Sequence, residues 1–145
     1  MNKLSIWKRN IDVKSINANM RNTMMSHIGI KITKIGENYI LGTMPVNNKT
    51  KQPFGILHGG ASVTLAESLG SLAANLCLNE NKYAVGLEIN ANHIKGVKSG
   101  IVEGKAQVLH LGRTTQVWEI KIHQGVKLTC SSRLTMAIIE KSVSS

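Results

Sequence analysis

The segment that decides the fold is GGASVTLAESLGSLAANLCL, residues 59–78. Four leucines recur in it at spacings of four, three and four, which places them on one face of a helix: Leu65, Leu69, Leu72 and Leu76. At 1.5 Å per residue this helix is about 30 Å long, enough to cross a whole sheet. The sequence therefore predicts one long amphipathic helix, ended by the polar residues 79–81.

On both sides of this helix the hydrophobic period changes to two. Residues 28–46 alternate around a turn at 36–38, which predicts a hairpin of two half-buried strands, and a polar loop follows at 45–55. Four more alternating stretches come after the helix, with inward sets Leu87/Ile89/Ala91, Val102/Ala106/Val108 and Trp118/Ile120/Ile122 and a last stretch at 128–139. Two strands, one helix and four strands predict a two-layer α+β fold, preceded by a short helix near residues 12–20.

Length and composition exclude several classes of protein. The chain has 145 residues, enough for one domain, and its 42% hydrophobic share supports an aliphatic core because only 3% is aromatic. A net charge of +10 permits an anionic partner, but so few aromatics leave little to stack on nucleic-acid bases, and no nucleic-acid motif is present. We expect neither nucleic acid nor a membrane as partner, because no apolar run approaches the roughly 20 residues that span a bilayer.

The cysteines and the first ten residues bear on compartment and metal binding. Cys77 and Cys130 lie in apolar stretches, and no cluster of cysteines and histidines offers a set of metal ligands. Residues 1–10 lack the apolar core and cleavage site of a signal peptide. We therefore expect a cytoplasmic protein with two buried, reduced thiols and no metal.

One carboxylate stands out as a candidate for chemistry. Glu67 is the only acidic residue between Glu37 and Glu80, on a helical face of small residues. A carboxylate kept from water there gains basicity and can act as general base or nucleophile. The alternative is a helical glutamate that simply reaches solvent.

The residues before the helix add a second feature. His58, Gly59 and Gly60 precede it, and a helix N-terminus presents free N–H groups to which glycine lets a carbonyl approach. The alternative is a tight entry turn. Gln52, one loop earlier, carries an amide that can orient a carbonyl or a water.

Four stretches together resemble a known family. They are QPFGILHGGASVTLAESLGS (52–71), GLEINANHIKGVKSG (86–100), LHLGRTTQVWEI (109–120) and CSSRLTMAII (130–139). They closely resemble the hotdog-fold acyl-CoA thioesterases, in the branch of the 4-hydroxybenzoyl-CoA and 1,4-dihydroxy-2-naphthoyl-CoA thioesterases. The nearest likeness is to the menaquinone-pathway type, and a type that clears mischarged aryl carrier proteins shares most of the motif. The resemblance implies a thioesterase domain over residues 21–140, an N-terminal extension or short helix at 1–20 and a flexible tail at 141–145.

The resemblance also implies an architecture and a set of roles. An antiparallel sheet of five to six strands wraps around the central helix, and homodimers, often paired into tetramers, place the active site between protomers. By position, Glu67 matches the catalytic carboxylate and Gly59 the backbone donor to the thioester carbonyl. The remaining matches are residues that support the carbonyl or hold water: Gln52, His58 and Ser71.

Further residues match the parts of the family site that hold substrate. Gly60 lies at the approach to the helix, and Leu72 borders the acyl pocket. Two polar regions match those that hold the nucleotide of coenzyme A: His93, Lys95 and Lys98, and the turn Gly112-Arg113-Thr114. Coenzyme A is part of the substrate, so no separate cofactor is implied.

Two departures from the menaquinone type leave the acyl group open. Leu72 is bulkier than expected, and Arg113-Thr114 replaces a small polar and a basic residue in inverted order. A proofreading thioesterase with a carrier-protein partner, and a domain that binds acyl-CoA without turnover, therefore remain alternatives. Other conspicuous side chains are predicted to be structural. Met24 and Met25 either fill the core, which is the favoured interpretation, or line an acyl pocket.

Overall fold

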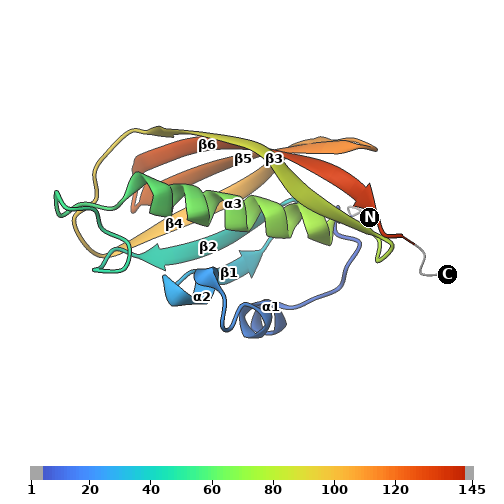
Figure 1. Ribbon diagram of the computed structural model, residues 1–145, viewed down its shortest axis with the longest axis horizontal. Coiled ribbons are helices and arrows are strands. Elements are labelled where there is room, and N and C mark those ends of the chain that lie inside the picture. The colour runs from blue at the N-terminus through green and yellow to red at the C-terminus, as the bar shows by residue number, and fades with distance from the viewer. Residues whose placement is uncertain (1–4, 143–145) are drawn as a thin grey trace.

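A computed structural model of the chain describes residues 5–142 and contains two layers, a six-stranded antiparallel sheet that curves around one long helix, α3 (Figure 1). The sheet order is β1-β2-β4-β5-β6-β3, so β1 and β3 are the edges. This confirms the predicted α+β architecture and the number of strands. The elements are α1 Val13–Asn19, α2 Met24–His27, β1 Lys31–Ile35, β2 Tyr39–Pro45, α3 Gly59–Leu76, β3 Lys82–His93, β4 Ile101–Leu111, β5 Thr115–Gln124 and β6 Lys127–Glu140.

The leucine stripe of α3 packs on the sheet. Leu65 and Leu69 are fully buried, and Leu69 fits over Gly42 and Gly104, which face each other on β2 and β4. A Cβ on either glycine would lie 2.6 Å from a Leu69 methyl, so the helix could not approach the sheet this closely if either residue had a side chain. The buried stripe is narrower than predicted, because Leu72 is only half-buried.

The N-terminal segment is anchored to the core. Trp7 stacks on the buried Trp118 with ring centroids 6.2 Å apart, and its Nε1 donates to the Gly36 carbonyl at 2.7 Å. The Arg9 guanidinium donates to the Leu78 and Lys82 carbonyls at 3.0 and 2.7 Å, just beyond the end of α3. These contacts fix the path of the chain that leads into α1.

The predicted short helix is confirmed, and a second one was missed. Asp12 caps α1 by accepting from the Ser15 N–H at 2.7 Å, which lowers the pKa of its carboxyl. Thr23 begins α2 with a reciprocal capping box to Ser26, and the first hairpin strand accordingly starts at Lys31 rather than at Ile28. The periodicity of residues 23–28 did not indicate this helix, because α2 is only four residues long.

One predicted side-chain orientation is wrong. The register of the edge strand β3 shifts between Gly86 and Glu88, and this irregularity turns Leu87 outward, where it is 62% exposed. The other predicted tail and extension residues, 1–4 and 143–145, lie outside the described residues. Within residues 5–142, no helix is long and apolar enough to cross a membrane.

Candidate active site

The N-terminus of α3 opens into a small hollow of about 220 Å³, which we call the donor hollow. Its lining includes Gln52, Gly59, His93 and Lys95, four of the residues selected from the sequence. The Gln52 backbone is fixed by a tight turn, in which its N–H donates to the Ile56 carbonyl at 2.9 Å. Among the described residues none accepts a hydrogen bond from the Gly59 N–H, so this donor is open to a ligand.

His58 begins the helix and uses its side chain to do so. Its Nδ1 accepts from the Gly60 N–H at 2.8 Å, and its own N–H donates to the Thr50 carbonyl at 2.8 Å. The Gly60 N–H is therefore already occupied, which leaves Gly59 as the free donor of the glycine pair. His58 thus has a capping role in addition to the supporting role that the resemblance implies.

His93, the last residue of β3, lies over Gly59. A Cβ on Gly59 would come 2.7 Å from His93 Nε2, so only glycine permits this approach without a shift of the imidazole. The structure therefore places His93 beside the backbone donor.

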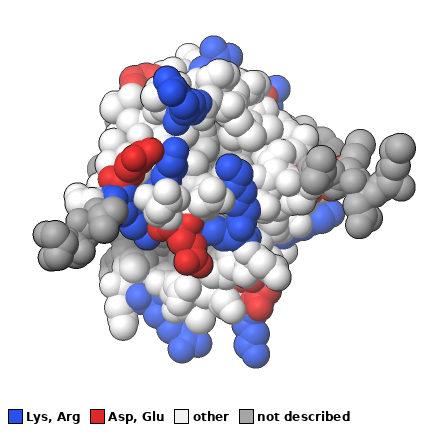
Figure 2. Space-filling model, turned by 90° about the vertical axis from the view of Figure 1, so that its right-hand side faces the viewer, with Lys and Arg blue, Asp and Glu red and all other residues white. Residues whose placement is uncertain are grey.

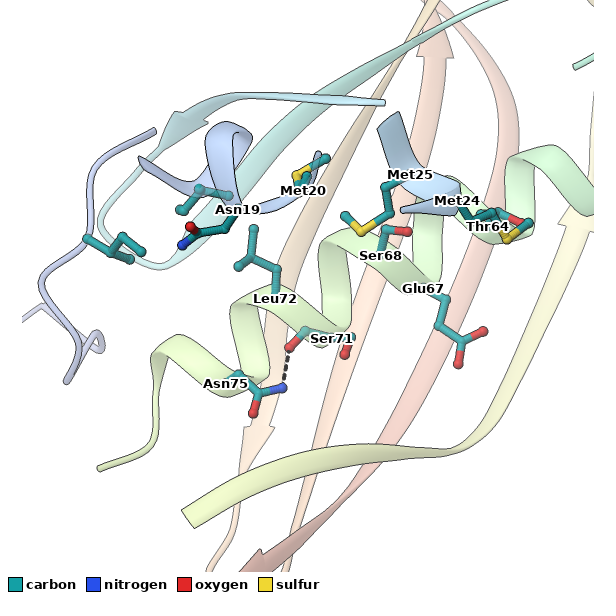
Figure 3. A pocket seen from close by; sticks show the side chains of 12 residues that line it. Asn19, Met20, Met24, Met25, Thr64, Glu67, Ser68, Ser71, Leu72 and Asn75 are labelled. Atoms are coloured by element: carbon teal, nitrogen blue, oxygen red, sulfur yellow. Dashed lines mark hydrogen bonds between the residues drawn. The ribbon is translucent and has the colours of Figure 1, made fainter. Parts of the chain in front are cut away.

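The face of α3 that carries Glu67 opens into a larger hollow of about 560 Å³, which we call the carboxylate trough. Glu67, Ser71 and Leu72 all line it, as Figure 3 shows. The Glu67 carboxylate lies against Gly86 of β3, where an added Cβ would be 2.8 Å from Oε1. The sequence predicted a carboxylate kept from water, but within the single chain Glu67 is exposed, because this stripe of α3 is open between β3 and the N-terminal helices.

The opposite wall of the trough is built by the N-terminal segment. Met20, Met24 and Met25 line it from α1 and α2, facing Thr64, Ser68 and Leu72 on α3 in Figure 3. The prediction that Met24 fills the core is wrong, since this side chain is 64% exposed, whereas Met25 is partly buried and packs against the core. Both methionines line the trough, because the missed helix α2 carries them there.

The two hollows are separate within one chain. Gly59 and Glu67 are eight residues apart on α3, which places them about 12 Å apart along the helix axis. A thioester carbonyl in contact with the Gly59 N–H is thus out of reach of the Glu67 carboxylate of the same chain. Within one chain, therefore, the Gly59 N–H and the Glu67 carboxylate do not meet at one carbonyl.

The residues selected for coenzyme A are not gathered together either. Lys95 lies in the donor hollow, whereas the exposed Lys98 lines neither hollow. The turn Gly112-Arg113-Thr114 lies at the other end of the sheet, where the Thr114 carbonyl accepts from the Ile138 N–H at 2.9 Å. On β6, His93 lies opposite Cys130, whereas the Thr114 carbonyl binds Ile138, eight residues further along the same strand. The two regions are therefore about 26 Å apart.

Several residues of the site were missed from the sequence, although two of them carried a signal. Gly86 is an isolated glycine in an alternating strand, a pattern that indicates a bulge or a close approach. Asn75 is a poor helix former inside a helix, and its amide binds the edge strand. Phe54, at the tip of the Gln52 turn, is 88% exposed but lines neither hollow.

The thiols lie away from both hollows. Burial raises the pKa of Cys77 to about 12 and also raises the pKa of Cys130, so both are protonated at neutral pH. In the described part of the chain, no group of three or more His, Cys, Asp or Glu side chains is placed to hold a metal ion.

Charge is distributed without a single dominant patch on the face at which α3 ends. Figure 2 shows basic and acidic side chains interspersed there. Lys82 and Glu140, for example, pair at 3.4 Å. This face does not offer the continuous basic surface that nucleic acid requires.

Comparison with known proteins defines the class. The family model of the Thioesterase superfamily matches residues 54–131. The 1,4-dihydroxy-2-naphthoyl-CoA hydrolase of Escherichia coli K12 is 50% identical over 135 residues, which cover 92% of this chain and 99% of that protein. The proofreading thioesterase EntH of Cronobacter sakazakii is 48% identical over 136 residues, with 92% and 98% covered.

A solved structure agrees with the sequence matches. The crystal structure of a thioesterase from Haemophilus influenzae superposes with a TM-score of 0.91 at 50% identity and covers 93% of this chain and 95% of that one. Fold and sequence together define an enzyme that hydrolyses thioesters. The chain belongs to the thioesterase superfamily, as the resemblance in its sequence predicted. These relatives match more of the chain than the predicted domain at residues 21–140 contains. The likeness therefore extends into the N-terminal segment.

Proposed function

We propose that the protein hydrolyses an aromatic acyl-CoA thioester to the free acid and coenzyme A, in a site shared by two subunits. The observation that carries this proposal is the separation of the donor hollow from the carboxylate trough on one helix. In a two-fold dimer with antiparallel α3 helices, Glu67 of one subunit faces Gly59 of the partner subunit. The two-fold axis repeats this arrangement, so each dimer has two equivalent sites. The dimer, and its pairing into a tetramer, are parts of the proposal.

The roles follow from the chemistry of thioesters. The carbonyl oxygen accepts from the free Gly59 N–H, whose donor strength is increased by the helix dipole, while Gln52 and His58 support the carbonyl. Glu67 either attacks the carbonyl carbon to form an anhydride or takes a proton from a water that attacks it, with Ser71 holding that water. In the first route the C–S bond breaks as the anhydride forms, and a water then hydrolyses the anhydride to the free acid and the Glu67 carboxylate. In the second route the C–S bond breaks after the water has added to the carbonyl, and in both the thiolate of coenzyme A leaves. In both routes one water is consumed.

The carboxylate trough supports an aromatic acyl group. Its methionine wall is flexible and polarisable, and sulfur contacts with aromatic rings are favourable by about 0.3–1.5 kcal/mol each. Leu72 borders the same space, so it limits the size of the ring system. The 1,4-dihydroxy-2-naphthoyl group of the E. coli relative's substrate is the acyl group that we propose, which would place the protein in menaquinone biosynthesis in the cytoplasm.

Cationic side chains account for the remaining part of the substrate. The pantetheine arm leaves through the donor hollow past Gly60, His93 and Lys95, and Lys98 follows in the exposed loop. Arg113, in the turn Gly112-Arg113-Thr114, offers a guanidinium suited to bidentate contact with a phosphate of the nucleotide. Because this turn is far from the donor hollow of its own chain, the proposal assigns it to the nucleotide bound at the other subunit's site.

A panel of thioesters tests the proposal. Release of free coenzyme A is measured with benzoyl, dihydroxynaphthoyl and straight-chain acyl-CoA on the wild type, on Glu67→Gln and on Glu88→Gln, an exposed glutamate on β3 that serves as control. Aromatic substrates are expected to lead, and Glu67→Gln to lose at least about 10³ in kcat, roughly 4 kcal/mol of transition-state stabilisation, while the control keeps its rate. Equal turnover by Glu67→Gln would remove the carboxylate from the mechanism, and a straight-chain preference would remove the aromatic acyl group.

A second candidate is proofreading of aryl carrier proteins. It is favoured by the 48% identity to EntH, close to the 50% identity to the hydrolase, so overall likeness does not separate the two. A carrier protein loaded with an aromatic acyl group is compared with the matching coenzyme A thioester. A higher kcat/KM for the loaded carrier protein would favour proofreading, and tight binding of either thioester without thiol release would indicate a non-catalytic module.

A further inference from the structure

Asn75 joins the helix to the edge of the sheet. Its Oδ1 accepts from the Ala84 N–H at 2.9 Å, and its Nδ2 donates to the Ala84 carbonyl at 3.2 Å and to the Ser71 carbonyl at 2.9 Å. Ala84 belongs to β3, the edge strand, so the amide binds backbone groups that have no neighbouring strand. The side chain of Asn75 thus takes the place of one residue of a seventh strand.

This contact is specific to one residue. Asparagine is a poor helix former, and in the middle of a helix it needs a compensating interaction. Within residues 5–142, no other side chain of α3 forms a hydrogen bond to the backbone of β3. Direct hydrogen bonds from α3 therefore reach β3 only at Ala84. On its other side the strand pairs with β6 from Lys82 to His93, and this ladder is irregular between Gly86 and Glu88.

The Glu67 carboxylate depends on that position. It lies against Gly86, two residues after Ala84, where a Cβ would come 2.8 Å from its Oε1. The neighbours of Gly86 on the strand are Val85 and Leu87, whose side chains would fill the space if the strand slid by one residue. Sliding by two would bring Ala84 or Glu88 under the carboxylate, which adds a Cβ or a like charge.

We propose that Asn75 is a positioning residue, which together with the ladder to β6 holds β3 in the one register along α3 that leaves Gly86 open to the Glu67 carboxylate. The inference rests on the proposed role of Glu67 as the catalytic carboxylate. Asn75 itself does not touch the reacting atoms. Its effect on turnover passes through the strand to the space that the carboxylate occupies.

A double-mutant cycle between Asn75 and Gly86 tests this inference. Asn75→Leu keeps the size of the side chain and removes all three hydrogen bonds, while Asn75→Asp keeps the acceptor for the Ala84 N–H. Gly86→Ala adds the methyl group that Glu67 must avoid. The matched control is Asn79→Leu, since Asn79 is exposed just beyond the helix and the structure shows no hydrogen bond from its side chain.

The expected result is a loss of kcat that is coupled between the two positions. Asn75→Leu should lower kcat about 10-fold with KM changed less than about 3-fold, Asn75→Asp should lie between it and the wild type, and Asn79→Leu should match the wild type. Gly86→Ala should lower kcat about 10-fold in the wild type but less than about 3-fold beside Asn75→Leu, because a released strand can move its new methyl group aside. The changes in thermal stability caused by the two substitutions should instead be additive in the double variant.

Some outcomes would overturn the inference, and others would distinguish its failure from the failure of the proposed function. Unchanged kcat in Asn75→Leu, or losses in kcat that simply multiply in the double variant, would show that Asn75 does not set the position of Gly86. If Asn75→Leu does not fold, the cycle with Asn75→Asp is judged by the same coupling. Full activity of Glu67→Gln would instead remove the proposed function, whereas an inactive Glu67→Gln with uncoupled Asn75 and Gly86 would remove only the positioning role.

Discussion

The donor hollow and the carboxylate trough lie on the same helix but are built in opposite ways. In the donor hollow the key group is a backbone N–H, fixed by the His58 cap and by a tight turn at Gln52. In the trough the key group is the side chain of Glu67, which is exposed and lies against Gly86. One half is rigid before substrate binds, whereas the other is completed by what covers it.

In the proposed mechanism, this difference is the reason that two chains are needed to complete one site. An oxyanion donor must be fixed in advance, because its value lies in requiring no reorganisation during the reaction. A carboxylate that must become basic gains from a cover that removes water, and the partner subunit supplies that cover in the proposed dimer. Because Gly59 and Glu67 are about 12 Å apart along α3, the proposed site needs Gly59 from one subunit and Glu67 from the other.

Removing the Gly59 N–H is expected to have the largest effect on the donor half. Gly59→Pro deletes this donor at the first helical position, which tolerates proline, and the extended His58 before it, at φ −69 and ψ 131, suits a residue that precedes proline. Gly59→Ala adds a similar bulk against His93 but keeps the N–H. In steady-state assays we expect kcat of Gly59→Pro to lie about 10²–10³ below that of Gly59→Ala.

The alanine variant is the matched control for this experiment. It reports the cost of displacing the His93 imidazole, and the difference between the two variants reports the hydrogen bond alone. Equal kcat values in the two variants would mean that the Gly59 N–H does not bind the carbonyl oxygen, and the donor hollow would lose its assigned role.

Filling the carboxylate trough is expected to change selectivity rather than chemistry. Met25→Trp places a larger side chain on the methionine wall, so kcat/KM for a dihydroxynaphthoyl thioester should fall about 10-fold or more, while that for acetyl-CoA should change less than about 3-fold. The methionine is only partly buried, and folding should be retained. A parallel fall for both substrates would place the acyl group elsewhere.

The smallest effect on thioesterase activity is expected at the thiols, which line neither hollow, so their prediction concerns reactivity and stability. Burial raises the pKa of the Cys77 thiol in the folded protein from its ordinary value of 9.0 to about 12. At pH 8 its native alkylation should be about 10³ slower than in denaturant, with Cys77→Ala identifying the remaining signal from Cys130. Because the unfolded thiol ionises first, stability should fall as pH rises from about 9 towards 12. Fast labelling in the native state would show that the C-terminal end of α3 opens.

Much of the fold could be predicted from the sequence, because periodicity reports burial directly. The leucine spacing identified α3, and the alternation of Trp118, Ile120 and Ile122 identified a strand whose inward side chains are fully buried. The prediction was wrong where a local irregularity interrupts the period. The shift beside Gly86 turned Leu87 outward, and the capped turn at Thr23 replaced the expected start of the first strand.

The site was harder to predict, because its geometry depends on long-range packing. The residues themselves singled out Glu67 and the glycine pair that contains Gly59, and the likeness to a known family added Ser71 and supplied the expected roles. No pattern along the chain shows that α2 directs Met24 and Met25 into the trough or that the His58 imidazole occupies the Gly60 N–H. These features arise only when the N-terminal segment and the loop at Thr50 pack against α3.

Subunit mixing is the most direct test of the shared site. Glu67→Gln and Gly59→Pro are each expected to be nearly inactive, but a dimer with one copy of each contains one site in which both halves are intact. Unfolding and refolding the two variants together at equal amounts should restore about a quarter of wild-type thioesterase activity, since about half of the dimers are mixed and each has one working site. Activity no higher than the sum of the separate variants, with mixed dimers shown by two different tags, would contradict a site built from two subunits.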